Sequence, residues 1–304
     1  MTVTASEVPG PVHSRSDTAV GLLLALRPRQ WTKNVLVLAA PFAAGALTSA
    51  PVLLRSLGAF AAFALAASGV YLVNDIRDRK ADRQHPTKCR RPIAAGRVPI
   101  WLAATAAGAL LAGALALSGW VALPLLVVLG VYEGVQLGYC FGLKHVPVVE
   151  MGIVASGFLL RAIAGGAATG IVLSNWFLLV SAFGSLFVVA GKRYAEALLV
   201  AGTDLRTRQA IRAYTPSYLR FVWMSSAAVI MSMYGLWAFD IHGASDSRWP
   251  IISMVPFVLA VLRYGMEVDN GSAGAPEDAL LGDRVLQVLF VLWAASLGLA
   301  LYVL

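Results

Sequence analysis

The sequence has few of the residues on which soluble enzymes, disulfide scaffolds and zinc modules depend. Only 13% of its 304 residues are charged, and it contains 2 cysteines and 4 histidines. A soluble domain carries about a quarter charged residues, so an ordinary cytosolic enzyme and a disordered chain are excluded. Cys89 and Cys140 are far apart and form no C-x-x-C pair, which excludes a disulfide scaffold and a zinc module.

Several functional motifs are absent as well. The chain has no G-x-x-x-x-G-K-[ST] phosphate-binding loop and no G-x-S-x-G nucleophile motif. Its first 17 residues lack the basic segment and apolar stretch of a signal peptide, so we expect a cytoplasmic tail there. We expect residues 1–20 to be flexible and residues 21–304 to form a single transmembrane domain.

Hydrophobic residues dominate what is present. They make up 59% of the chain and fall in blocks of about 20, the length that crosses a bilayer core of about 30 Å. This pattern predicts an all-α polytopic membrane protein, a helical bundle of about nine transmembrane helices. Gly165, Gly166 and Gly170 form a patch of small residues that should allow close helix packing. The expected spans are 33–50, 52–74, 99–118, 120–142, 148–169, 175–191, 217–239, 249–265 and 285–304.

The distribution of charge predicts the orientation. The 24 lysines and arginines outnumber the 16 acidic residues and give a net charge of +8. With a cytoplasmic N-terminus, all basic residues except Arg55, Arg161 and Arg248 lie in or beside cytoplasmic loops, as the positive-inside rule requires. We therefore expect an integral plasma membrane protein, and no nucleic-acid partner, because the basic segments lack stacking aromatics. The expected cytoplasmic loops are 75–98, 143–147, 192–216 and 266–284, the last of them an acidic, solvated loop.

The strongest candidate site lies where the second span ends. Asp75, Asp78 and Asp82 are spaced by three and four residues, so a continuing helix would place them on one face, with Asn74 one turn before Asp78. Carboxylate and amide oxygens in this arrangement suit Mg²⁺. The alternative is a solvated face whose acids are neutralised by the basic residues interleaved with them.

Basic residues near the predicted cytoplasmic surface form a second set of candidates. Lys88 and Arg91 follow the aspartates in a stretch stiffened by prolines, which suits a phosphorylated ligand or simply reflects the positive-inside rule. Lys144 lies in a short loop on the same side. Lys192 and Glu196 are four residues apart, so a local ion pair is the alternative to ligand binding.

Arg161 interrupts an otherwise apolar span. A central arginine costs roughly 2.5–3.5 kcal/mol on insertion scales, so it should face a polar environment and a partner. Two interpretations stay open, a role in an anion-binding cavity and a structural ion pair. Lys33, at the cytoplasmic end of the first span, is expected to reach the same cavity.

The segment 74–82 resembles the first aspartate-rich motif of the UbiA superfamily of intramembrane prenyltransferases. The general pattern of that superfamily has a second aspartate-rich motif after the sixth span. This chain has Lys192, Arg193 and a single carboxylate, Glu196, at that place. Replacing acids by bases favours a donor with an additional phosphate. Within that superfamily, the chain shows a closer likeness to the actinobacterial decaprenyl-phosphate phosphoribosyltransferase branch. The segments that carry it are 27–34, 74–82, 85–88, 91–96, 139–145, 161–166 and 191–196.

The resemblance implies a UbiA-like bundle with a cavity on the cytoplasmic side and a Mg²⁺-dependent transferase. The implied reaction moves a 5-phosphoribosyl group from 5-phosphoribosyl 1-diphosphate to a polyprenyl (decaprenyl) phosphate and releases diphosphate. Its product would serve the synthesis of cell-wall arabinan and arabinogalactan. The implied metal ligands are Asn74, Asp75, Asp78 and Asp82, the three aspartates being catalytic. The implied substrate-binding residues are Lys33, Tyr71, Lys88, Arg91, Lys144, Arg161, Lys192, Tyr194 and Glu196.

Two other functions stay open at this point. A UbiA-type prenyltransferase acting on an aromatic acceptor fits the first motif, but the missing second motif argues against it. A transporter of phosphorylated solutes would place several polar groups near the bilayer midplane, whereas the charges of this chain crowd one membrane face. The sequence leaves the oligomeric state open, a homo-oligomer included.

Overall fold

The computed structural model describes residues 15–200, 213–245, 247–271 and 282–302. Within these ranges every regular element is helical. Of the predicted tail, residues 1–14 lie outside the described residues, and residues 15–20 begin the first helix. The elements are α1 (Arg15–Ala25), η1 (Pro28–Leu38), α2 (Ala39–Ala43), α3 (Ala50–Arg83), η2 (Lys88–Arg90), α4 (Ile100–Val121), α5 (Leu123–Phe141), η3 (Leu143–His145), α6 (Val149–Thr169), α7 (Asn175–Val200), α9 (Pro216–Ser245), α10 (Trp249–Asp269) and α12 (Arg284–Tyr302).

Eight helices in the described part of the chain are long and apolar enough to cross a membrane, which confirms the polytopic all-α prediction. Eight of the expected spans are single helices of spanning length, whereas the span expected at 33–50 is not one continuous helix. It consists of the 3₁₀ helix η1 and the short helix α2. Pro41 in α2 has no N–H for a helical hydrogen bond, and β-branched residues in η1 lower the α-helical propensity.

Helix α3 extends further than predicted. The apolar span was expected to end at residue 74, but the helix continues to Arg83. The aspartate segment therefore lies on the last turns of α3, and residues 84–99 form the loop that leads to α4.

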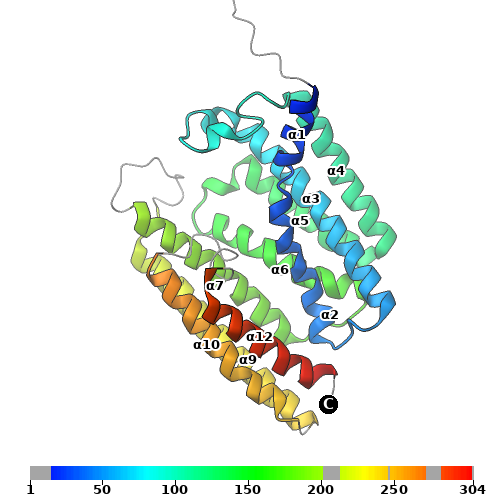
Figure 1. Ribbon diagram of the computed structural model, residues 1–304, viewed down its shortest axis with the longest axis vertical. Coiled ribbons are helices and arrows are strands. Elements are labelled where there is room, and N and C mark those ends of the chain that lie inside the picture. The colour runs from blue at the N-terminus through cyan, green and yellow to red at the C-terminus, as the bar shows by residue number, and fades with distance from the viewer. Residues whose placement is uncertain (1–14, 201–212, 246, 272–281, 303–304) are drawn as a thin grey trace, which may run out of the picture.

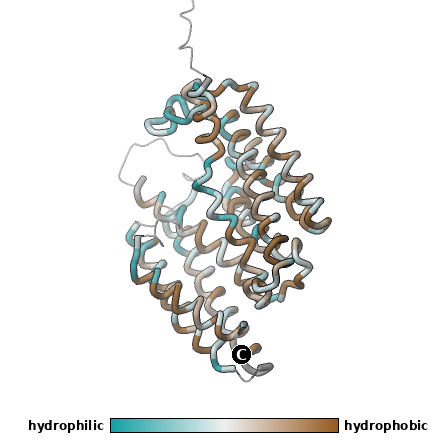
Figure 2. Tube along the Cα trace, turned by 45° about the vertical axis from the view of Figure 1, so that its right-hand side comes forward, coloured by the Kyte–Doolittle hydropathy of each residue, from teal (hydrophilic) through white to brown (hydrophobic). Residues whose placement is uncertain are grey.

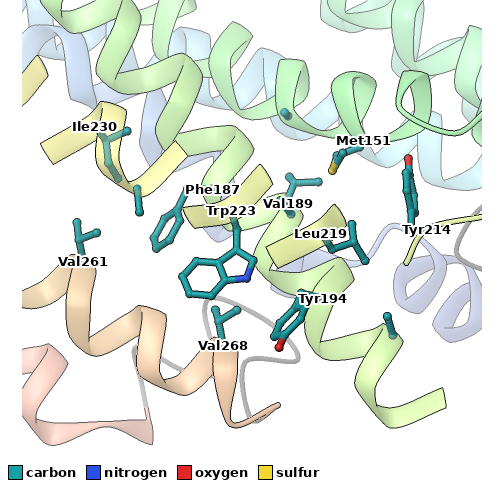
Figure 3. Packing of buried hydrophobic residues seen from close by; sticks show 14 residues of the cluster. Met151, Phe187, Val189, Tyr194, Tyr214, Leu219, Trp223, Ile230, Val261 and Val268 are labelled. Atoms are coloured by element: carbon teal, nitrogen blue, oxygen red, sulfur yellow. The ribbon is translucent and has the colours of Figure 1, made fainter. Parts of the chain in front are cut away.

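The helices form two groups that meet where α6 packs against α7 (Figure 1). Helix α3 packs against α4, α5 and α6, whereas α10 packs against α9, α12 and α7. Each group has its own hydrophobic core. One surrounds Phe63 and Tyr132, and the other surrounds Phe187 and Trp223, whose rings lie close together in Figure 3.

Gly165 determines how closely η1 approaches α6. A Cβ atom at this position would lie 2.1 Å from the carbonyl oxygen of Val37, so only glycine permits this contact. Gly170 has a different role from the one expected of the small-residue patch. Its φ of +76° is left-handed, and it ends α6 instead of packing against a neighbouring helix.

The long loops meet at one end of the bundle, which we call the charged end. Side-chain contacts there join the start of η1 and η3 to α3, α6 to α7, and α9 to α10. These contacts bring together the described parts of all four loops that the sequence assigns to the cytoplasmic side. Figure 2 shows hydrophilic segments in the loop after α3 and hydrophobic ones along the helices.

Candidate functional site

Three aspartates line one face of α3 at the charged end. Asp75, Asp78 and Asp82 are separated by three and four residues in a continuous helix, so their side chains point the same way. Asp75 and Asp82 are almost completely buried, with 2% and 4% of their surface exposed, and Asp78 is half-buried. We call this group the aspartate face. Buried carboxylates need partners, and the fold supplies basic ones.

Each aspartate of this face contacts a basic side chain from another segment. Arg27 Nη2 donates to Asp75 Oδ1 at 2.5 Å. Arg91 Nη1 bridges two carboxylates, donating to Asp82 Oδ2 at 2.8 Å and to Asp75 Oδ1 at 3.2 Å. Lys144 forms an ion pair with Asp78. Arginine and lysine at these positions offset the mutual repulsion of the carboxylates.

Arg27 was not among the predicted site residues, although it begins one of the segments that carry the family resemblance. It lies between α1 and η1 with a left-handed φ of 54°, a strained conformation for a residue other than glycine. Its guanidinium carbon lies 4.9 Å from the centre of the Tyr71 ring. Tyr71 is one turn before Asp75, so Arg27 contacts two predicted site residues at once.

The loop after α3 folds back over the aspartate face. Arg83 Nε donates to the carbonyl oxygen of Ala94 at 2.9 Å, and Ile93 and Ala94 are buried. Arg91 reaches the carboxylates from this loop, and the half-buried Lys88 lies on η2 within it. Burial and the neighbouring charge of Lys88 lower the pKa of His85.

The oxygen donors of the aspartate face fit a hard divalent cation by their chemistry, since carboxylates and the Asn74 amide are the ligands that Mg²⁺ prefers. In the described part of the chain, no three acidic, histidine or cysteine side chains converge on one point. The carboxylates instead accept hydrogen bonds from Arg27, Arg91 and Lys144. A cation and an anionic ligand could enter together, the carboxylates turning to the cation and the bases to the anion.

Arg161 lies away from the aspartates, in the interior of the bundle. Its Nε donates to Asn34 Oδ1 at 2.7 Å, Nη1 to the Gly157 carbonyl at 2.6 Å and Nη2 to the Tyr132 hydroxyl at 3.1 Å. Its guanidinium also faces the rings of Tyr132 and Phe63. Among the described residues it forms no ion pair, so the ion-pair interpretation of this arginine does not hold.

Lys33 and Asn34 bring η1 to α6 beside Arg161. The ammonium of Lys33 lies 5.9 Å from the centre of the Phe158 ring, one turn before Arg161. Asn34 is completely buried, and its Nδ2 has no hydrogen-bond partner in the described structure. Asn34 was not among the predicted site residues, and its signal in the sequence is a polar side chain in a predicted apolar span.

The basic segment at the end of α7 is organised by Arg193. Its guanidinium donates to both carboxylate oxygens of Glu150, at 2.8 and 3.1 Å, and to Glu196 at 2.7 Å. The ion partner of Glu196 in the described structure is therefore Arg193, and not Lys192 as the alternative to ligand binding had it. Lys192 itself is half-buried.

Tyr194 points into the second core. Its hydroxyl donates to Asp269 at 3.1 Å and accepts a hydrogen bond from Arg220, so it joins α7 to α9 and α10. Figure 3 shows its ring among the buried side chains around Trp223. These contacts place Tyr194 away from the aspartate face.

A further contact ties the loop before α6 to the start of α9. The backbone N–H of Val148, which has a positive φ of 66°, donates to the hydroxyl of Tyr214. Burial raises the pKa of Tyr214. Because Lys144 is in the same loop, Tyr214 and Arg193 help to hold it where it contacts Asp78.

The chain resembles known proteins over most of its length. Residues 35–281 match the UbiA prenyltransferase family. The decaprenyl-phosphate phosphoribosyltransferase of Mycobacterium tuberculosis is 55% identical over 291 residues, covering 94% of this chain and 95% of that protein. The protein of the same name from Mycolicibacterium smegmatis is 52% identical over 294 residues, covering 93% of this chain and 92% of that protein.

A solved structure supports the same fold. A UbiA homolog from Archaeoglobus fulgidus bound to DMAPP and Mg²⁺ superposes with a TM-score of 0.67 at 16% identity, covering 93% of this chain and 100% of that one. At this identity the likeness concerns the fold alone. With a family match over most of the chain and full-length relatives above half identity, this integral membrane protein belongs to the UbiA prenyltransferase family.

Proposed function

We propose that the protein transfers a 5-phosphoribosyl group from 5-phosphoribosyl 1-diphosphate to decaprenyl phosphate or a similar polyprenyl phosphate. The observation that carries this proposal is the 52–55% identity to two decaprenyl-phosphate phosphoribosyltransferases over more than nine-tenths of each chain. The lipid product would supply pentose units for cell-wall arabinan and arabinogalactan. The charged end would face the cytoplasm of the cell, where the water-soluble donor is available.

The aspartate face is the proposed donor site. Asn74, Asp75, Asp78 and Asp82 would hold Mg²⁺ together with the diphosphate of the donor. When bound, the metal would supply positive charge that stabilises the departing diphosphate. The oxygen-only donor set on one face of α3 supports this assignment, and the archaeal homolog solved with Mg²⁺ belongs to the same fold.

The basic partners of the aspartates would bind the donor directly. Arg27, Arg91 and Lys144 neutralise the carboxylates in the present arrangement and are within reach of a diphosphate at the same place. Charge-assisted hydrogen bonds to phosphate oxygens would replace those to the carboxylates. The Tyr71 hydroxyl, one turn before Asp75, is a further donor on this face.

The remaining predicted residues fall into two kinds. Lys88 and Lys192 are half-buried bases at the charged end and are proposed to contact phosphate oxygens. Tyr194 and Glu196 have protein partners, Asp269 and Arg193, which favour a positioning role for them.

The reaction needs no strong general base. The acceptor phosphate is already an anion, and its oxygen would attack C1 of the ribose as the bond from C1 to the diphosphate breaks. Attack from the opposite side would invert the configuration at C1, from α in the donor to β in the product. The protein's own contribution would be to hold both anions in line and to stabilise the leaving charge electrostatically.

The test is a substrate comparison with purified protein in detergent or vesicles. Labelled 5-phosphoribosyl 1-diphosphate with Mg²⁺ and decaprenyl phosphate should give a labelled lipid and free diphosphate, and omission of Mg²⁺ should abolish it. Transfer of a prenyl group from a prenyl diphosphate to an aromatic acid, with no ribosyl transfer, would overturn the proposal. So would uptake of a phosphorylated solute into vesicles without any chemical change.

A further inference from the structure

Two buried arginines of this bundle differ in the charge of their hydrogen-bond partners. Arg193 has 6% of its surface exposed and binds two carboxylates, those of Glu150 and Glu196. Arg161 has 5% exposed and lies in the transmembrane helix α6, yet its three hydrogen bonds to described residues all go to uncharged oxygens. A buried charge without a counter-charge is costly, so the second arrangement needs an explanation.

Arg161 and Asn34 together have more N–H donors than the described structure supplies with acceptors. A guanidinium has five N–H groups, and the bonds to Asn34, Gly157 and Tyr132 use one on each nitrogen. Asn34 accepts a hydrogen bond from Arg161 through its Oδ1 atom, whereas the Nδ2 atom of Asn34 is buried and has no hydrogen-bond partner in the described structure. What this group lacks is an anionic oxygen ligand.

We propose that Asn34, Tyr132 and Arg161, which we call the Arg161 site, bind a phosphate monoester. A monoester group carries several acceptor oxygens and a negative charge, which match the spare donors and the unpaired cation. The rings of Tyr132 and Phe63 form walls beside the guanidinium, at 5.0 and 5.6 Å from their centres. Such apolar walls lower the local dielectric constant, which would strengthen the attraction between the guanidinium and an anion.

The position of the Arg161 site fits the two-anion reaction, and in this respect the inference rests on the proposed function. Asn34 lies seven residues after Arg27, which contacts Asp75, and the 3₁₀ helix η1 joins them. At about 2 Å per residue this is about 14 Å along the backbone. Lys33 lies on η1 between these two residues, with its ammonium over the ring of Phe158. Both proposed substrates carry a phosphate monoester, the donor at its ribose C5 and the acceptor at the end of its lipid chain.

The decisive variant is Asn34→Asp. It keeps the shape of the side chain but places a carboxylate against Arg161, so an internal ion pair would replace the external anion. The purified full-length protein should stay folded, with an unchanged or raised melting temperature, and should bind the monoester at least tenfold more weakly. Asn270→Asp makes the same change at the exposed end of α10 and should leave binding unchanged.

Two probes distinguish the sources of the phosphate, each titrated by calorimetry without Mg²⁺. Weakened binding of ribose 5-phosphate would assign the Arg161 site to the donor, and weakened binding of farnesyl phosphate would assign it to the acceptor. Equal affinity of wild type and Asn34→Asp for both probes would overturn the inference. If Asn34→Asp does not fold, Asn34→Ser removes the amide donors without adding charge and should weaken the same probe severalfold.

Failure of the inference can be told apart from failure of the proposed function. Ribosyl transfer by wild type with unaltered KM values in Asn34→Asp would reject the Arg161 site and keep the function. Binding of a monoester that depends on Asn34, in a protein that transfers no ribosyl group, would keep the site and reject the function.

Discussion

Arg27 Nη2 lies 2.5 Å from Asp75 Oδ1, although 48 residues separate them in the chain. This contact joins the start of η1 to the last turns of α3 at the charged end, beside the ring of Tyr71. Arg27 is held in a left-handed conformation to make it. Strain of this kind persists only where surrounding contacts outweigh it, which is typical of functional sites.

Replacing Arg27 tests the importance of this contact. In Arg27→Ala the buried Asp75 carboxylate keeps only Arg91, so we expect a loss of about 1–3 kcal/mol in stability. Ribosyl transfer should fall at least tenfold, and Arg27→Lys should recover part of it because the charge is restored. Arg29→Ala, an exposed arginine of the same segment, is the control. Activity of Arg27→Ala equal to that of the control would contradict a role in the donor site.

The metal assignment is tested by Asp78→Asn. Asparagine has nearly the same size as aspartate and does not interrupt α3, so the protein should fold and insert into the membrane. Mg²⁺-dependent transfer should nevertheless fall at least a hundredfold. Asp240→Asn changes an exposed carboxylate of α9 that accepts a hydrogen bond from Trp176, and this variant should be fully active. Mg²⁺ titrations of both variants give the result, and a normal rate in Asp78→Asn would remove this residue from the metal site.

The buried ion pair between Arg193 and Glu150 should dominate the stability of the α6–α7 contact. Glu150→Ala leaves Arg193 with a single carboxylate, Glu196, and breaking a buried pair costs about 3–5 kcal/mol. Glu196→Ala removes the more exposed partner and should cost about 1 kcal/mol or less. Thermal unfolding in detergent compares the two variants. Equal melting temperatures would show that the pair contributes little.

The start of α12 should be sensitive to acid. A hydrogen bond from Arg263 Nε, at 2.6 Å, holds the pKa of Asp283 below its ordinary value. A depressed carboxyl pKa contributes stability that is present above the unfolded pKa of about 3.9 and is lost as the pH falls through the folded pKa. As the pH is lowered from about 6 to about 3, the melting temperature of the wild type should therefore drop more than that of Asp283→Asn. Parallel curves for the two proteins would contradict this.

The proposed orientation can be tested with the native cysteines. Cys89 is half-buried in the loop after α3, whereas Cys140 is buried with its Sγ near the Val70 carbonyl. An impermeant maleimide should label Cys89 in inverted membrane vesicles and not in intact cells. Cys89→Ser should abolish the labelling. Labelling of Cys89 in intact cells would place the charged end outside.

The alignment of the aspartates on one helix face and the membrane character of the chain could both be predicted from local sequence patterns. Both depend on local periodicity: apolar blocks of spanning length, and three carboxylates spaced so that any continuing helix aligns them. Local periodicity failed at residues 33–50, where Pro41 and β-branched residues accompany a 3₁₀ helix followed by a short α-helix.

Which charged side chains contact one another depends on the packing of the helices. Arg91 and Lys144 reach the aspartates, Arg193 takes Glu196 away from Lys192, and Arg161 meets Asn34 across 127 residues. Sequence spacing cannot specify such pairs, because they depend on how η1, α6 and α7 pack against their neighbours. That packing follows from close contacts such as that of Gly165 with the Val37 backbone, and it sets which polar groups are buried together.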